Sequence, residues 1–154
     1  LQIAEQLGVD LVISEGVIDG SWVDPLVKAI GNVDYVVEAS GTEEAIRDGL
    51  RVVKRRGKFL ELGVLGKPCN LDFVQLVYKE VTAVGSIASV RSSWITALDL
   101  VKSGKVNLKL LVGPTFPFDR WREAFAAAEE GVGIKTIIYP QESTPVRNLS
   151  GLPI

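Results

Sequence analysis

Short apolar runs alternate with amphipathic stretches through residues 10–88, and this alternation constrains the fold more than any other feature. The run VDYVVE, within residues 33–41, is nearly continuous in apolar residues, as in a strand that is covered on both faces. Similar runs occupy residues 57–64 and 81–88. Strands separated by helical stretches pair in parallel, because the chain must cross over the sheet between them. The sequence therefore predicts an α/β fold with an open parallel sheet.

Helical periodicity fills the gaps between these runs. Residues 21–30 carry apolar side chains on one side, and Gly31 ends the pattern. A longer helix is expected from residue 42 to residue 56, with the basic residues Lys54, Arg55 and Arg56 at the negative end of its dipole. We also expect a short helix at residues 74–78 and a short strand at residues 11–13.

The rhythm changes after residue 89. Two amphipathic helices are predicted, at residues 94–101 and 121–128, with a proline-rich connector, GPTFPF, between them. A last strand is expected at residues 134–139, followed by a loose tail at residues 141–154. The predicted organisation is therefore one domain over residues 1–89, part of a second over residues 90–140, and the tail.

Composition excludes several classes of partner. The chain has 154 residues, of which 17 are basic and 19 acidic, for a net charge of -2. Such a balance offers no field that would recruit nucleic acid or an anionic membrane surface. No run approaches the roughly 18 apolar residues that a membrane-spanning helix needs. We expect a soluble, cytoplasmic protein.

Two residue types are missing. The sequence contains no histidine, and Cys69 is its single cysteine, so it offers no imidazole for proton transfer and no thiol pair for a metal. Methionine is also absent, and residues 3, 4 and 7 already follow helical spacing. We therefore expect the chain to be a fragment, or a gene product that resembles one.

Small residues follow each of the predicted strands. Ser40 and Gly41 end the first, Gly63 ends the second, and Ser86 lies near the end of the third. In an open parallel sheet, ligands bind beyond the carboxyl ends of the strands, where the loops part. Residues without bulky side chains let a flat ring or a ribose lie against the main chain there. The recurrence of small residues at successive strand ends predicts a binding site at this edge.

Several segments in order make a family resemblance specific. They are EASGT at residues 38–42, LGV at 62–64, TAVGSIA at 82–88, and the later DLVKSGKVNL, FPFDRWREAFAAAEEG and IKTIIYP. Together they resemble the carboxyl-terminal half of the zinc-type medium-chain alcohol and polyol dehydrogenases, in the sorbitol and threonine dehydrogenase branch. The resemblance implies a partial Rossmann-type, doubly wound sheet carrying strands three to six, then a return to the catalytic domain.

The same resemblance implies roles for individual residues. Ser40 and Gly41 correspond to the turn beside the adenosine ribose, and Leu62, Gly63 and Val64 to the strand end that meets the nicotinamide. Ser86, Ile87 and Ala88 correspond to the segment that brackets the carboxamide, and Lys135 to a basic residue near the pyrophosphate. No catalytic residue and no metal ligand is expected in this chain.

Some of the family's machinery is absent from the sequence. The Gly-x-Gly-x-x-Gly turn and the acidic residue that selects NAD over NADP are not present, so either cofactor remains open. The resemblance places the zinc ligands in the other half of the parent protein. Glu38 is interpreted as structural rather than as a general base, and Cys69 as a thiol without a ligand role.

Three functions remain open. The leading hypothesis is hydride transfer between a nicotinamide and a secondary alcohol or polyol, by a parent protein of which this chain is an inactive part. The chain could instead be a non-catalytic binding or oligomerisation module, or a zinc-independent relative of the quinone reductases. The resemblance also implies a homodimer through the edge strand at residues 81–86. Residues 10–14 are predicted to pair with residues 33–38, to pair with another chain, or to lie apart.

Overall fold

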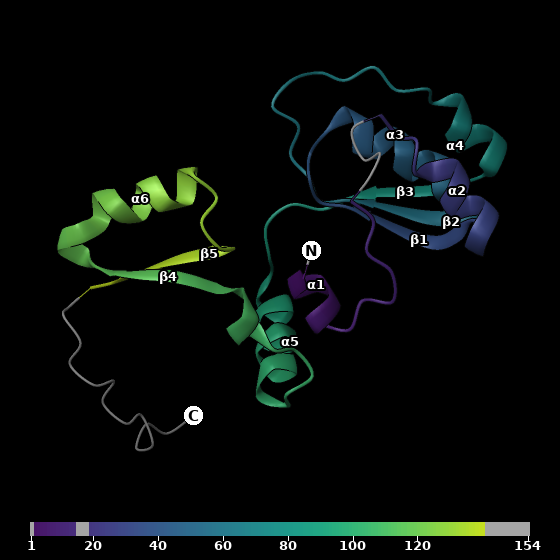
Figure 1. Ribbon diagram of the computed structural model, residues 1–154. Helices are drawn as coiled ribbons and strands as arrows, with labels where there is room; N and C mark the ends of the chain where they lie inside the picture. Colours follow the sequence, from purple (N-terminus) through teal and green to yellow (C-terminus); the bar gives the residue numbers. More distant parts are fainter. Residues whose placement is uncertain (1, 15–18, 141–154) are drawn as a thin grey trace. The chain divides into compact units, whose positions relative to one another are not determined.

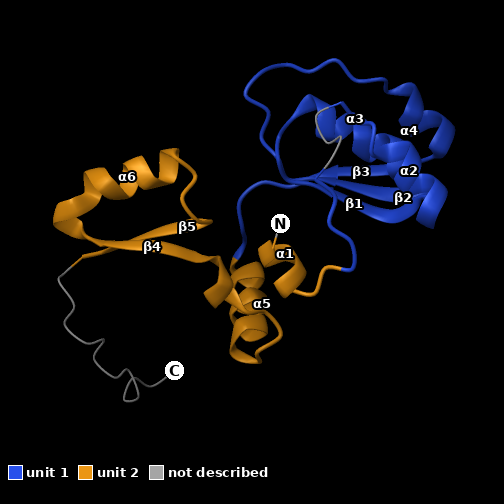
Figure 2. Cartoon of the chain, in the orientation of Figure 1, with its two compact units in different colours: residues 1, 10–90 blue, residues 2–9, 91–154 orange. Residues whose placement is uncertain are grey.

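The computed structural model describes residues 2–14 and 19–140 (Figure 1). The chain divides into two compact units, one built from residues 10–90 and the other from residues 2–9 together with the chain from residue 91 onward (Figure 2). Each unit is described by itself. The tail predicted at residues 141–154 lies outside the described residues.

The first unit is built on a parallel sheet of three strands in the order β1-β2-β3 (Figure 1). The strands are β1 (Val33–Glu38), β2 (Val53–Glu61) and β3 (Thr82–Gly85). Their register aligns Glu38 with Glu61, and Glu61 with Gly85, so all three strands end at the same edge. The predicted α/β class and the parallel pairing are confirmed.

Helices cover one face of this sheet. The first unit contains α2 (Val23–Ile30), α3 (Glu43–Val52) and α4 (Val74–Lys79), of which α3 and α4 pack on the strands (Figure 1). Thr42 caps α3, because its hydroxyl accepts a hydrogen bond from the amide of Ala45. The core beneath α3 consists of Ile46, Leu50 and Phe59. This packing fixes the position of the strand ends.

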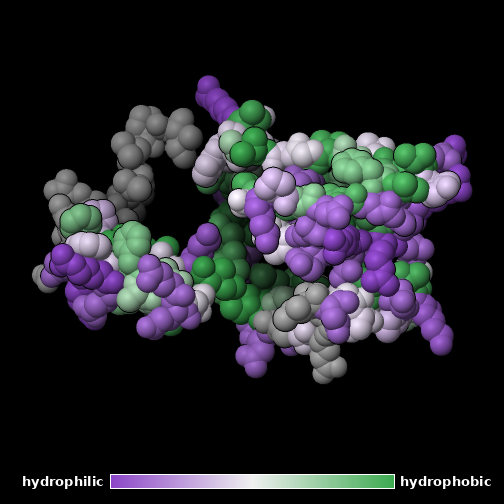
Figure 3. All heavy atoms as spheres, turned by 90° about the horizontal axis from the view of Figure 1, so that it is seen from above, coloured by the Kyte–Doolittle hydropathy of each residue, from purple (hydrophilic) through white to green (hydrophobic). Residues whose placement is uncertain are grey.

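The opposite face of the sheet is open in the described part of the chain. Tyr35, Val37 and Val84 alternate with the core residues of their strands and are all more than half exposed. Apolar side chains also reach the surface elsewhere, in both units (Figure 3). The stripe of α5 (Arg91–Lys102), for example, leaves Trp94 63% exposed.

The strand predicted at residues 11–13 does not form. This segment is an irregular chain with Leu11 55% exposed, and residues 10–14 do not pair with residues 33–38. Pairing of this segment with another chain stays a prediction. Three apolar residues bury too little surface to offset the entropy of ordering a strand at the sheet edge. Consequently β1 is an edge strand, as is β3.

The helix predicted from residue 42 to residue 56 is too long. It ends at Val52, and β2 begins at Val53. The placement of Lys54, Arg55 and Arg56 at a helix end is therefore wrong. In β2, Lys54 pairs with Asp34, and Arg55 and Arg56 each lie 2.8 Å from a carboxylate oxygen of Glu80. Adjacent valines at 52 and 53 favour the extended conformation, and these ion pairs hold the charged residues in the strand.

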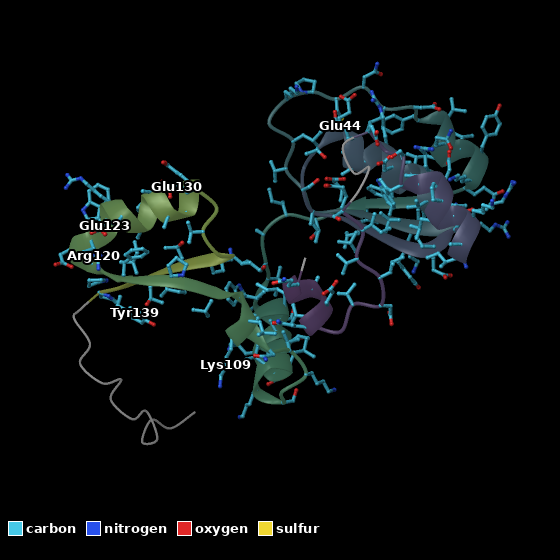
Figure 4. All side chains as sticks on the ribbon, in the orientation of Figure 1. Glu44, Lys109, Arg120, Glu123, Glu130 and Tyr139 are labelled. Carbon is cyan, nitrogen blue, oxygen red and sulfur yellow. The ribbon has the colours of Figure 1, made fainter. Side chains whose placement is uncertain are left out.

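The second unit combines helices with a two-stranded parallel sheet. Its elements are α1 (Gln2–Gln6), α5, the 3₁₀ turn η1 (Leu108–Leu111), β4 (Val112–Pro117), the 3₁₀ turn η2 (Phe118–Arg120), α6 (Trp121–Glu129) and β5 (Lys135–Tyr139). β4 pairs with β5, and α6 packs on both strands. An ion pair between Arg120 and Glu123 lies at the start of α6 (Figure 4).

The proline-rich connector is in fact the strand β4. Its prolines, Pro114 and Pro117, are tolerated because β4 has a single neighbour, so some of its amides need no partner. Among the described residues, no helix combines the length and the apolar character that crossing a bilayer requires.

Candidate functional site

The predicted site residues of the first unit lie along one edge of the sheet. Three segments follow the strand ends, Ser40–Gly41, Leu62–Val64 and Ser86–Ala88, and we call them the strand-end rim. The Leu62 amide donates to the Glu38 carbonyl at 2.8 Å, and the Ser86 amide donates to the Glu61 carbonyl at 3.0 Å. These bonds extend the sheet pairing past the strand ends and join the three segments. The structure thus brings together eight of the nine predicted residues.

Two glycines allow the first two segments to touch. A β-carbon at Gly63 would collide with the Gly41 backbone nitrogen and with Oε2 of Glu38. It would also lie 2.5 Å from the Gly41 Cα. A β-carbon at Gly41 would lie 2.7 Å from the Val64 carbonyl oxygen, and Gly41 has a φ of +70°. Both positions therefore need glycine, one for space and the other also for its left-handed backbone.

Glu38 holds the first segment of the rim in place. This side chain is buried, and its Oε1 accepts hydrogen bonds from the Ser40 amide at 2.7 Å, the Ser40 hydroxyl at 2.5 Å and the Gly41 amide at 3.0 Å. Burial opposes ionisation, but the hydrogen bonds from Ser40, Glu61 and Gly41 prevail and keep the pKa of Glu38 below its usual value. An ionised carboxylate committed to these donors fits the structural role predicted for it.

Glu61 is the member of the site that the sequence analysis missed. It lies beside Glu38 in register on the next strand, and its two carboxylate oxygens are buried. Burial, followed by the hydrogen bond to the Glu38 carboxylate and the negative charge of that group, raises the pKa of Glu61 to about 7. The available signal was a glutamate inside the apolar run FLELG, where a buried charge is costly unless it is paired.

The rest of the rim offers main chain rather than functional side chains. Val64 is 75% exposed and Ile87 is 84% exposed, and neither carries a polar group. Ala88 has a φ of +60°, a left-handed conformation that few residues other than glycine adopt. A ligand at this edge would therefore meet peptide groups, which can hydrogen-bond a planar amide and fix its orientation.

Lys135 belongs to the second unit. It begins β5, where it is exposed and aligned with Val112 of β4. The geometry of the rim therefore does not test its predicted role near a pyrophosphate, and that role stays a prediction.

The residues present do not fit a catalytic zinc ion. The sequence has no histidine, and its one cysteine, Cys69, is half-buried in the loop between β2 and α4. Within residues 2–14 and 19–140, no group of three or more Cys, Asp or Glu side chains could hold a metal. A catalytic zinc takes three protein ligands from such residues. No chemical step of this chain is therefore assigned to a metal.

Comparison of the sequence with known protein families identifies the family to which the chain belongs. The family described as zinc-binding dehydrogenase matches residues 1–103. The chain belongs to the zinc-binding dehydrogenase family. This match confirms the family resemblance that the strand-end segments of the zinc-binding dehydrogenase chain predicted.

Polyol dehydrogenases are among its relatives. The chain is 30% identical to a sorbitol dehydrogenase of Halalkalibacterium halodurans over 142 residues, which are 91% of this chain and 41% of the relative. It is 30% identical to a D-arabitol-phosphate dehydrogenase of Enterococcus avium over 147 residues, 94% of this chain and 41% of the relative. The zinc-binding dehydrogenase chain thus spans about two fifths of the length of the curated relatives it matches.

Solved structures show the same fold. An alcohol dehydrogenase from Thermotoga maritima superimposes with a TM-score of 0.80 at 25% identity, over 91% of this chain and 40% of that one. A 2R,3R-butanediol dehydrogenase from Bacillus subtilis gives a TM-score of 0.79 at 24% identity, over 91% of this chain and 40% of that one. The Rossmann-like arrangement expected for the zinc-binding dehydrogenase chain is confirmed.

Proposed function

We propose that the strand-end rim holds NAD or NADP, with the nicotinamide against Leu62–Val64 and Ser86–Ala88, in a parent protein that transfers hydride between the nicotinamide and a secondary alcohol or polyol. One observation carries the proposal: three consecutive strand ends are joined side by side and present peptide groups without bulky polar side chains. A nicotinamide is planar and carries one carboxamide, so main-chain donors and acceptors suffice to orient it.

Each segment of the rim has a task in this proposal. Ser40 and Gly41 contact the adenosine ribose, and the Glu38 carboxylate fixes their turn. Leu62–Val64 provide the main chain against one face of the ring, and Ser86–Ala88 bracket the carboxamide. Lys135 lies near the pyrophosphate. The nicotinamide, when bound, accepts or supplies the hydride, and the residues of this chain orient its ring and exclude water from one side.

The remaining chemistry belongs to the rest of the parent protein. The substrate would be a polyol, as the names of the sorbitol and D-arabitol-phosphate relatives suggest. The zinc ligands, the acid and base groups and the phosphate-binding turn would come from outside this sequence. The chain by itself is then inactive, in a parent enzyme that works in the cytoplasm.

Fluorescence titration tests the cofactor proposal on the chain itself. NADH should bind weakly, because the rim engages the nicotinamide while no turn for the pyrophosphate is present in the sequence. The emission of the dihydronicotinamide should shift on binding, and ADP-ribose, which lacks the nicotinamide, should compete poorly. Equal binding of ADP-ribose and NADH, or no emission change at any NADH concentration, would count against the proposal and favour a non-catalytic module.

The proposed homodimer uses the outer edge of β3. All four residues of this strand are exposed, and its only partner in the described sheet is β2. The Ser86 amide points toward β2, and amides alternate along a strand, so the Ala83 amide points outward. Pairing of two β3 strands across a two-fold axis would satisfy these outward groups.

Sedimentation velocity tests this interface. The chain should form a dimer as its concentration rises, and Ala83→Pro should abolish the dimer because proline has no amide hydrogen to donate. The matched control Ala83→Val keeps the amide and should still dimerise. A wild-type chain that stays monomeric at high concentration would contradict the assignment.

A further inference from the structure

Two carboxyl groups lie side by side at the strand-end rim. Glu38 ends β1 and Glu61 ends β2, and the register of the sheet aligns them. The Glu38 side chain is buried, both side-chain oxygens of Glu61 are buried, and a hydrogen bond joins the two groups. We call Glu38 and Glu61 the carboxyl pair. Two negative charges so close together in a buried place repel each other, so such a pair holds one proton near neutral pH.

The surrounding donors decide which member of the pair carries the proton. Glu38 accepts hydrogen bonds from the Ser40 amide, the Ser40 hydroxyl and the Gly41 amide, and these donors favour its ionised form. For Glu61, burial, the hydrogen bond to Glu38 and the charge of Glu38 outweigh a hydrogen bond from the Gly63 amide and raise the pKa to about 7. The proton therefore resides on Glu61, whose hydroxyl donates to the Glu38 carboxylate.

The other ionisable groups on the elements packed against β2 are engaged elsewhere or exposed. β3 carries no ionisable side chain. On β1, α3 and α4, four groups have partners: Asp34 pairs with Lys54, Glu43 with Arg47 and Asp48 with Arg51, and Lys79 donates to the carbonyls of Leu50, Arg51 and Val53. The remaining groups on these elements and on the loop between β2 and α4 are the exposed Tyr35, Glu44, Lys67, Asp72 and Tyr78 and the half-buried Cys69. The titration of Glu61 is therefore governed by Glu38.

The carboxyl pair lies where the first two segments of the rim meet. The amides of Leu62 and Gly63 donate to the Glu38 carbonyl at 2.8 and 3.2 Å. The Glu38 carboxylate lies so close to Gly63 that a β-carbon there would collide with its Oε2 atom, and the same carboxylate holds Ser40 and Gly41. A negative charge on Glu61 would repel this carboxylate, and the turn that is tied to it would move away from Leu62–Val64.

We propose that the carboxyl pair is a proton switch for the strand-end rim: the protonated pair holds Ser40–Gly41 against Leu62–Val64, and loss of the Glu61 proton to solvent separates the two segments. The inference deepens the proposed function and rests on it where it concerns the cofactor, because a separated rim no longer presents one continuous surface. A nucleotide that binds the joined rim binds the protonated form. Its affinity is therefore highest below the Glu61 pKa of about 7 and falls as pH rises through this value.

Hydrogen exchange of the free chain tests the switch without a nucleotide. The protection factor of the Leu62 amide, which is already corrected for faster intrinsic exchange at high pH, should fall about tenfold between pH 6 and pH 9. The Ser86 amide is the internal control, because it bonds the Glu61 carbonyl on the other side of β2 and should lose far less protection. Constant protection of Leu62, or equal losses at Leu62 and Ser86, would overturn the proposal.

Fluorescence titration with NADH at the same two pH values tests the consequence for the cofactor. The wild-type chain should bind roughly tenfold more weakly at pH 9, which corresponds to a rise of one unit in the Glu61 pKa on binding. Glu61→Gln keeps an amide that can donate to Glu38 but has no proton to lose in this range, so it should remove the pH dependence of both affinity and Leu62 protection. The matched control Glu44→Gln, at an exposed glutamate, should keep the wild-type dependence.

The two measurements distinguish failure of the switch from failure of the cofactor function. Absence of NADH binding at both pH values would refute the cofactor proposal, and Leu62 protection alone would then decide the switch. Equal NADH affinity at pH 6 and pH 9 in the wild-type chain, or a pH dependence that survives in Glu61→Gln, would overturn the switch. Amide spectra at each pH establish that every variant is folded.

Discussion

Replacing Gly63 with alanine is expected to destabilise the first unit by about 2–3 kcal/mol and to eliminate nicotinamide binding. The added methyl group would occupy the space now taken by the Gly41 backbone and by the Glu38 carboxylate. Backbone atoms cannot move aside without breaking the hydrogen bond between the Leu62 amide and the Glu38 carbonyl. The rim would therefore separate between its first two segments.

Urea unfolding, followed through amide signals of the first unit, measures this effect. The control is Gly66→Ala in the same loop, where an added β-carbon meets nothing within 4 Å. The control should change the unfolding free energy by less than about 0.5 kcal/mol. Equal stability of the two variants would show that the close approach of the strand ends does not constrain position 63.

Replacing Glu61 with leucine is expected to stabilise the first unit at neutral and alkaline pH and to remove most of the pH dependence of its stability. Burial raises the pKa of Glu61 from 4.5 to about 7, so the folded state binds the proton more tightly than the unfolded state. Below pH 4.5 both states are protonated and no penalty exists. Between about pH 4.5 and 7 the unfolded state loses its proton first, and stability falls as pH rises.

Above pH 7 the penalty is constant and amounts to at most about 3 kcal/mol. Leucine fits the apolar surroundings of Glu61 and carries no charge, so the variant should not show this decline. Glu38 acts in the opposite direction, because its lowered pKa adds stability that is lost as pH falls below about 4.5. The two effects thus occupy different pH ranges.

Chemical denaturation at a series of pH values tests this prediction. The control Glu44→Gln changes an exposed glutamate in the first turn of α3 (Figure 4) and should keep the decline between pH 4.5 and 7. A wild-type stability that rises through this range, or a Glu61→Leu variant that retains the full decline, would be incompatible with a buried, protonated Glu61.

Local patterns in the sequence were sufficient to predict the parallel sheet and its edge. The runs that became β1, β2 and β3 are strongly apolar and are punctuated by small residues, and Thr42 marks the start of α3. Because the carboxyl ends of parallel strands lie at one edge of a sheet, the direction of the strands was enough to predict that the three rim segments lie together. The assignment of these residues to a cofactor is still a prediction.

Other features depended on contacts that are distant in sequence. The end of α3 could not be located from periodicity, because Arg55 and Arg56 suit a helix end until Glu80 pairs with them in the strand. The strand β4 could not be predicted because prolines argue against a strand unless it lies at the edge of a sheet, as β4 does. The sequence predicts that Glu61 lies in a buried strand, but only the register of the sheet shows that Glu38 lies beside it.

The most direct test of the cofactor site maps a nicotinamide onto the chain. Nicotinamide mononucleotide is titrated into isotope-labelled protein, and the amide chemical shifts are followed residue by residue. We predict that the largest changes fall on Gly63, Ser86 and their neighbours within Leu62–Val64 and Ser86–Ala88, and that Gly63→Ala eliminates them. Changes confined to the second unit, or no changes at saturating nucleotide, would contradict the assignment of the rim to the nicotinamide.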